Sequence, residues 1–215
     1  MARYSVVLFD LDGTLIDSIG LIVDSFHHAL AAHGLPRQTD ATWLRTIGTP
    51  LRAAFAPFAA SDAAQDEMVR VYREHNLANH DARVRAYPGV LDCVRALRAA
   101  GVALAVVTSK SRAGTLRGLR VAGLEGEFSA LVCLDDVTNA KPHREPCDRA
   151  LALLGARPAE ALFVGDSVHD MHAGRAAEVP TGAALWGPFD REHLAPSAPT
   201  HWLKSPGAVL DVVLG

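Results

Sequence analysis

Two aspartates separated by a single residue follow a short apolar run near the amino terminus. The run covers residues 5–9, and the next residues are Asp10, Leu11, Asp12, Gly13 and Thr14. Side chains alternate along an extended chain, so Asp10 and Asp12 point to one side and Leu11 to the other. Two carboxylates held this close repel each other unless a cation or a shared proton lies between them. Because Mg²⁺ prefers oxygen ligands, the spacing predicts a magnesium site here.

Gly13 and Thr14 complete this segment with features suited to binding an anion. A glycine lets the backbone turn sharply and present its N–H groups, and the threonine adds a hydroxyl. A capping aspartate in an ordinary Asp-Gly turn is the plainer interpretation. Asp10 lies at the strand end before any turn residue is needed, however, so we predict that Gly13 and Thr14 bind a phosphate group.

Polar residues also follow three further apolar runs. They are Thr108, Ser109 and Lys110 after residues 102–107, Lys141 beyond residues 130–134, and Asp166 after residues 161–164. In open parallel sheets, ligands bind outside the carboxyl ends of the strands. We therefore expect these side chains to meet at one edge of a sheet, beside the end of the first strand.

Apolar runs alternate with helical periodicity through most of the chain. The expected strands cover residues 5–9, 102–107, 130–134, 161–164, 181–186 and 201–203. The expected helices between them cover residues 90–100, 112–121, 145–154 and 171–178. Strands that alternate with helices of this length predict an α/β fold, with a Rossmann-like parallel sheet flanked by helices.

Residues 16–83 differ from the rest, because they show helical periodicity and no strand-like alternation. Helices are expected from residue 19 to 30, from 39 to 47, from 51 to 58 and from 61 to 77, with breaks at Gly34 and Gly48. We predict a Rossmann-like core of residues 1–15 and 84–215, and a small all-helical domain of residues 16–83 inserted after the first strand.

Composition excludes several classes of protein. The chain has 215 residues and a formal net charge of −3, so we expect neither nucleic acid nor a membrane as a partner. Its three cysteines include no CxxC pair, which argues against a disulfide framework. No apolar stretch approaches the ~20 residues of a membrane span. We expect a cytoplasmic protein that is a monomer or a homodimer.

The segment Asp-Leu-Asp-Gly-Thr at residues 10–14 resembles the first motif of the haloacid dehalogenase superfamily in its phosphatase form. Thr108 resembles the second motif, a hydroxyl at a strand end, and Lys141 resembles the third. Residues 165–170 resemble the fourth, an acidic pair separated by three residues. The resemblance covers the whole chain. The helical insert is similar to the cap of the phosphoglycolate-phosphatase-like and phosphoglucomutase-like members.

This resemblance implies a phosphatase that works through an aspartyl-phosphate intermediate. Asp10 is ionised at neutral pH and could attack phosphorus without an activating base. Asp12 would protonate the leaving oxygen and later deprotonate the attacking water. Thr108 and Lys141 would bind the phosphate oxygens and neutralise their charge.

The resemblance also implies ligands for the metal and for the substrate. Mg²⁺ would be held by Asp10, Asp166 and the backbone carbonyl of Asp12, and Asp170 would orient a metal-bound water or Lys141. Ser109 and Lys110 would add contacts to the phosphate. Arg52, a planar cation in the cap, would bind a carboxylate or a second phosphate of the substrate.

The leading hypothesis is a Mg²⁺-dependent phosphatase that acts on a small phosphate ester, and phosphoglycolate, pyrophosphate and sugar phosphates are all compatible with it. A phosphomutase of the β-phosphoglucomutase type and a non-catalytic regulatory protein that retains the site are the alternatives. A dehalogenase would need neither Mg²⁺ nor a second acidic residue, so Asp12, Asp166 and Asp170 count against it.

Overall fold

The computed structural model describes residues 2–215 and contains a six-stranded parallel sheet. Its strands run in the order β5-β4-β1-β6-β7-β8. Their bounds are Val6–Phe9 for β1, Ala103–Val107 for β4, Ala130–Val132 for β5, Ala161–Gly165 for β6, Thr181–Ala184 for β7 and His201–Leu203 for β8. The α/β fold with a Rossmann-like parallel sheet is therefore confirmed.

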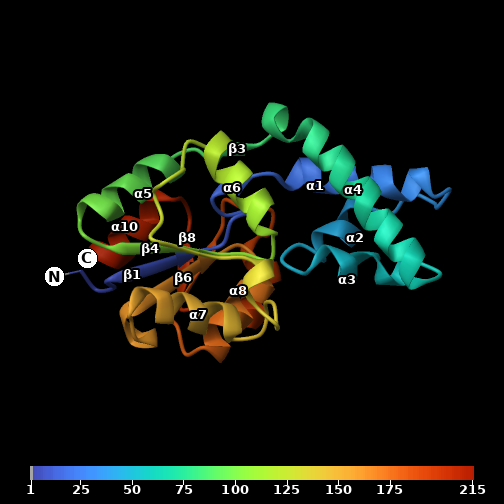
Figure 1. Ribbon diagram of the computed structural model, residues 1–215. Helices are drawn as coiled ribbons and strands as arrows, with labels where there is room; N and C mark the ends of the chain where they lie inside the picture. The colour runs from blue at the N-terminus through green and yellow to red at the C-terminus, as the bar shows by residue number, and fades with distance from the viewer. Residues whose placement is uncertain (1) are drawn as a thin grey trace.

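Helices cover both faces of this sheet (Figure 1). One face carries α5 (Val90–Ala99), α6 (Arg112–Val121) and α10 (Gly207–Leu214), and the other carries α7 (Glu145–Leu154) and α8 (Val168–Ala176). Strand β1 lies between β4 and β6, and all four of its residues are buried. Val7 and Phe9 pack on the first face, and Val6 and Leu8 pack on the second. A strand covered on both faces needs a continuous apolar run, as β1 has.

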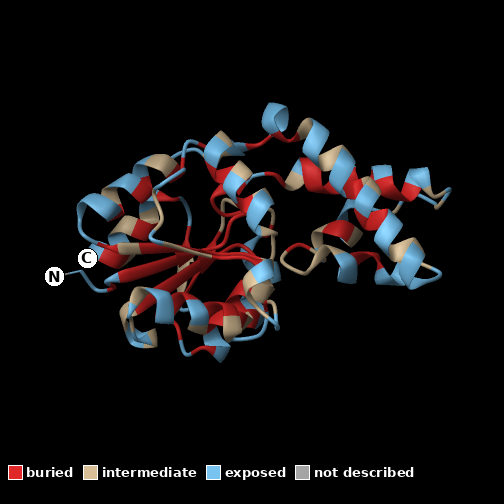
Figure 2. Ribbon diagram, viewed as in Figure 1, coloured by how far each residue is buried: buried red, intermediate tan, exposed pale blue. Residues whose placement is uncertain are grey.

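Four helices between residues 19 and 83 form a lobe beside the sheet, which we call the helical lobe (Figure 1). They are α1 (Ile19–Ala32), α2 (Asp40–Leu44), α3 (Leu51–Phe55) and α4 (Asp62–Arg83), with a short 3-10 turn at Ala56–Phe58. The lobe has its own apolar cluster, in which Phe26 stacks on Trp43 with 4.3 Å between ring centroids. Figure 2 shows buried residues concentrated where these helices face one another. The lobe therefore has an apolar cluster of its own, and its assignment as a domain of residues 16–83 stays a prediction.

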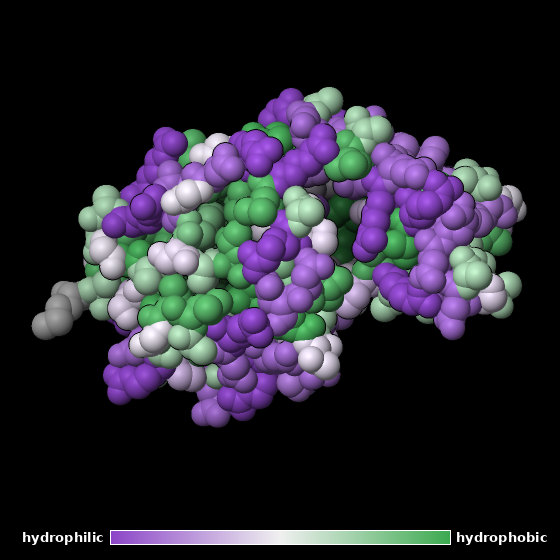
Figure 3. All heavy atoms as spheres, in the orientation of Figure 1, coloured by the Kyte–Doolittle hydropathy of each residue, from purple (hydrophilic) through white to green (hydrophobic). Residues whose placement is uncertain are grey.

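Two short strands connect the lobe to the rest of the chain. Strand β2 (Ile16–Asp17) pairs antiparallel with β3 (Arg85–Ala86), so the chain enters and leaves the lobe through adjacent segments. Sequence periodicity did not predict this pair, because a two-residue strand is too short to show alternation. On the surface in Figure 3, the molecule is hollowed where the lobe meets the sheet-containing core.

Several expected elements differ at their ends. Strands β5 and β7 end two residues earlier than expected, and α8 begins three residues earlier, because Ser167 caps it. Helix α10 was not predicted; its residues Val209 and Val213 pack against the core. The short helix α9 (Arg191–Leu194) and the 3-10 turns at Leu134–Asp136, Pro158–Glu160 and Ala195–Ser197 were also not predicted. Within residues 2–215, no helix combines the length and apolar character needed to cross a membrane.

The aromatic cluster of the helical lobe predicts a large effect of truncating Phe55, which is fully buried. We expect Phe55→Ala to lower the free energy of unfolding by about 3–5 kcal/mol, because it leaves a cavity among packed rings. Leu77→Ala in α4 is the matched control, since Leu77 is 55% exposed and its loss should cost less than about 0.5 kcal/mol. Urea unfolding followed by tryptophan fluorescence measures both. Equal effects of the two substitutions would contradict a packed core in the lobe.

Candidate active site

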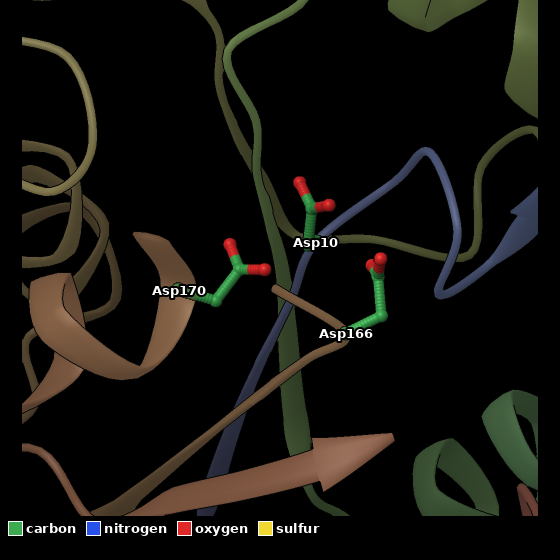
Figure 4. A group of neighbouring side chains, drawn as sticks. All are labelled: Asp10, Asp166 and Asp170. Atoms are coloured by element: carbon green, nitrogen blue, oxygen red, sulfur yellow. The ribbon is translucent and has the colours of Figure 1, made fainter. Parts of the chain in front are cut away.

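Three aspartates converge at the carboxyl edge of the sheet (Figure 4). Asp10 directly follows β1, Asp166 directly follows β6, and Asp170 lies in the first turn of α8. One carboxylate oxygen from each lies within 4.8 Å of the others, and all three residues are buried. The structure therefore brings together three of the four aspartates that were expected at the metal site.

Lys141 is the cation in contact with this group. Its Nζ donates to Asp10 Oδ1 at 2.7 Å and to Asp170 Oδ1 at 2.6 Å. The lysine is 2% exposed and also lies 3.4 Å from the carbonyl oxygen of Val107. Burial alone would lower the pKa of Lys141, but the two carboxylates outweigh burial and raise it. Lys141 therefore stays charged at neutral pH.

Burial disfavours the charged forms of the aspartates. Desolvation raises the pKa of Asp10 to about 7, although Lys141 lowers it in part and Asp170 adds to the increase. Desolvation also raises the pKa of Asp166 well above its ordinary value, with contributions from Asp170 and Asp10. One lysine does not balance three ionised carboxylates, so the group must either hold protons or bind a further positive charge.

The surroundings of Asp166 fit a divalent cation. Its Oδ1 accepts from Thr14 Oγ1 at 2.7 Å, whereas its buried Oδ2 has no hydrogen-bond partner among residues 2–215. Gly13 leaves the space that the carboxylate occupies, since a Cβ at this position would lie 2.5 Å from Asp166 Oδ2. An oxygen held without a partner beside two further carboxylates could bind a divalent metal ion. Thr14, expected at the phosphate, contacts this aspartate instead.

The first turn of α8 fixes the orientation of Asp170. Its Oδ2 accepts from the N–H of Ser167 at 3.0 Å and from Ser167 Oγ at 2.7 Å, while Ser167 Oγ accepts from the N–H of Asp170. This capping arrangement leaves Asp170 Oδ1 for Lys141. Of the two roles expected for Asp170, the structure shows the contact with Lys141.

Asp12 lies outside this carboxylate group. Both of its oxygens accept from Lys110 Nζ, at 2.8 and 3.1 Å, and Oδ1 also accepts from Ser18 Oγ at 2.6 Å. Lys110, which was expected to bind phosphate, therefore holds Asp12. Sequence reasoning missed Ser18 as a partner of Asp12, although it directly precedes α1 and lies only six residues after Asp12.

Thr108 and Ser109 follow β4 and lie at the same edge. Thr108 is buried, and its hydroxyl oxygen accepts from the N–H of Lys110 at 3.2 Å. Ser109 Oγ donates to the carbonyl oxygen of Gly48 in the helical lobe at 2.7 Å. The segment around Gly48 thus contacts a residue that was predicted to bind phosphate, where a cap was expected to approach the site.

Arg52 is not among the groups that meet at the sheet edge. Its guanidinium donates to Asp62 at 2.9 Å and also pairs with Asp66, both in α4. Its side chain is 45% exposed. Substrate binding by Arg52 stays a prediction, and in this arrangement the arginine links α3 to α4.

The fold and this site define a hydrolase. Residues 7–184 match the family model of haloacid dehalogenase-like hydrolases, and the chain belongs to that family. The sequence is 42% identical over 210 residues to pyrophosphatase PpaX of Anoxybacillus flavithermus, covering 97% of this chain and 96% of the relative. It is 40% identical over 210 residues to pyrophosphatase PpaX of Bacillus pumilus, with the same coverage.

Solved structures agree with this assignment. A haloacid dehalogenase-like hydrolase from Bacteroides fragilis superposes with a TM-score of 0.89 and 28% identity, covering 96% of this chain and 100% of that one. A structure described as a predicted phosphoglycolate phosphatase from Haemophilus somnus gives a TM-score of 0.85 and 27% identity, covering 99% of both chains. The chain is therefore an enzyme of this hydrolase family, and the resemblance to the haloacid dehalogenase superfamily is confirmed.

The raised carboxyl pKa values predict a pH-dependent effect of Mg²⁺ on stability. An aspartate whose pKa is raised by folding favours the protonated form, so the metal-free protein loses stability as the pH rises from about 4 towards 7. A cation bound to the ionised carboxylates offsets this loss. We expect Mg²⁺ to raise the melting temperature more at pH 8 than at pH 5, by at least about 3 °C.

Differential scanning fluorimetry with Mg²⁺ or EDTA measures this effect. Asp166→Asn should remove most of it, whereas Asp211→Asn, a change of equal charge on the exposed face of α10, should retain it. A Mg²⁺ effect of the same size at both pH values would contradict cation binding by these carboxylates.

Proposed function

We propose that this hydrolase is a Mg²⁺-dependent phosphatase that acts on a small phosphorylated anion through an aspartyl-phosphate at Asp10. The observation that carries the proposal is the contact of Asp10 with Lys141, at a sheet edge where Thr108 and Ser109 also lie. A buried nucleophile beside a fixed positive charge suits attack on a phosphoryl group, which needs charge neutralisation and positioning.

Asp10 supplies the nucleophile. Because Lys141 holds Oδ1, attack on phosphorus falls to Oδ2, and the bond between phosphorus and the leaving oxygen breaks as the new bond forms. Asp10, Asp166 and Asp170, together with the backbone carbonyl of Asp12, are the groups that would hold Mg²⁺. When bound, this cation would neutralise charge on the transferring phosphoryl group.

Asp12 is the candidate acid and base. It lies close enough to Asp10 to raise the pKa of that aspartate further, and Lys110 and Ser18 fix the direction of its side chain. Asp12 would give a proton to the leaving oxygen and then take one from the water that hydrolyses the acyl phosphate. Lys110 thus acts as a positioning residue for Asp12 in this proposal.

Pyrophosphate is the substrate that we propose first. It is named for the relatives at 37–42% identity, which this chain matches over 95–97% of their length. Phosphoglycolate is the second candidate, because solved structures of similar fold carry that name at 26–27% identity. Both compounds are small phosphorylated anions, so the same catalytic residues would serve either.

The test is phosphate release by the purified protein from pyrophosphate, phosphoglycolate, sugar phosphates and p-nitrophenyl phosphate, each with Mg²⁺ or with EDTA. We expect Mg²⁺-dependent release, fastest from pyrophosphate. A faster reaction with phosphoglycolate would keep the phosphatase and correct the substrate. Absence of release from every compound by folded protein would refute the proposal.

Asp10→Asn should lower kcat by at least about 10³-fold, because the amide keeps the shape of the side chain but cannot serve as the nucleophile. The circular dichroism spectrum should not change. Asp211→Asn is the control for the loss of one carboxylate, and its kcat should equal that of the wild type. Substantial turnover by Asp10→Asn would exclude the aspartyl-phosphate route.

A further inference from the structure

A cleft outside the carboxylate group lies between the helical lobe and the core. Its volume is about 290 Å³, roughly that of ten water molecules in the liquid. The lobe contributes two lining residues from the segment after α2, and the core contributes the start of α8 and the segment after β7. The lining residues are Arg45, Ile47, Ser167, Val168, His169, Phe189 and His193.

The charges around this cleft favour an anion. Among its lining residues within 2–215, none is acidic, whereas one is an arginine and two are histidines. Among residues 2–215, Arg45 pairs with no aspartate or glutamate, unlike Arg52 in the same lobe. His193 stacks on Phe189, another lining residue, with 4.4 Å between ring centroids. An unpaired guanidinium beside ring N–H groups can recognise a phosphate or a carboxylate.

The cleft adjoins the residues that we assign to catalysis. Ser167 lines it and also donates to Asp170, which in turn holds Lys141. Gly48 lies between the cleft and Ser109, whose hydroxyl donates to its carbonyl oxygen. A Cβ at position 48 would lie 3.1 Å from Ser167 Oγ and 3.2 Å from the His169 ring, so glycine lets this segment of the lobe approach both lining residues closely.

We propose that the cleft binds a second anionic group of the substrate, carried by the leaving group, and that Arg45 is its main recognition residue. The inference rests on the proposed phosphatase function and extends it to a substrate class. That class comprises compounds with a phosphoryl group at one end and another compact anion at the other. The second anion is a phosphate in pyrophosphate and a carboxylate in phosphoglycolate. Each carries negative charge and offers two oxygens to which a guanidinium can donate two parallel hydrogen bonds.

The test compares Arg45→Gln with wild-type enzyme on three substrates in the presence of Mg²⁺. For pyrophosphate or phosphoglycolate, whichever the wild type prefers, KM should rise about 10- to 100-fold with little change in kcat, since a charge-assisted contact to the bound anion is lost. For p-nitrophenyl phosphate, whose leaving group has no second anion of this kind, kcat/KM should stay within about twofold. Arg45→Lys should recover part of the loss, because it restores the charge without the fork of donors.

Arg73→Gln is the matched control, because Arg73 is exposed in α4 of the same lobe and the change removes the same charge. It should leave KM for all three substrates unchanged. A similar loss in Arg73→Gln, an equal loss of p-nitrophenyl phosphate turnover in Arg45→Gln, or an unchanged KM for the preferred substrate would each overturn the inference. Wild-type enzyme that releases no phosphate from any compound would instead refute the proposed function.

Discussion

Burial of three carboxylates at one end of a parallel sheet is the constraint on which the rest of this site depends. Asp10, Asp166 and Asp170, if ionised, carry three negative charges, and Lys141 returns one positive charge. The remaining two negative charges match one divalent cation. Buried charge without compensation costs several kcal/mol per ion, so the metal-free site can reduce the cost by holding protons. This explains why burial raises the pKa of Asp10 and Asp166.

The same constraint determines small structural details around the aspartates. Gly13 must lack a side chain because the Asp166 carboxylate occupies the space where a Cβ would lie. Gly165 is restricted in the same way, since a Cβ there would lie 2.5 Å from the Asp170 carboxyl carbon. Ser167 begins α8 and uses its own cap to orient Asp170. Glycine at positions 13 and 165 thus leaves the space that the buried carboxylates occupy.

Sequence reasoning predicted the parts of the site that end strands. A buried parallel strand needs a continuous apolar run, and the first polar residue after it marks the functional edge, as with Asp10, Thr108 and Asp166. It could not predict contacts between side chains that the fold alone brings together. Lys110 was assigned to phosphate and instead pairs with Asp12, 98 residues away, because both project from neighbouring strand ends.

Residues of the helical lobe were harder to assign, for a related reason. Helical periodicity shows which side faces the lobe's own cluster, but a charged residue on the opposite side can face solvent, a neighbouring helix or the core. Arg52 follows the break at Gly48 and was expected at the substrate, yet two aspartates of α4 neutralise it. Arg45 precedes the same break and had no distinguishing pattern, and only the packing of the lobe on the core shows that it faces a cleft.

The groups assigned to phosphoryl transfer lie in the core, whereas the residue proposed to recognise the leaving group, Arg45, lies in the helical lobe. These core groups come from strand ends and a helix start, and Lys141 comes from the loop that precedes α7. The lobe reaches this edge through the segment around Gly48, which contacts Ser109 on one side and Ser167 and His169 on the other. Substitutions in that segment can therefore change which leaving group is bound without moving the nucleophile.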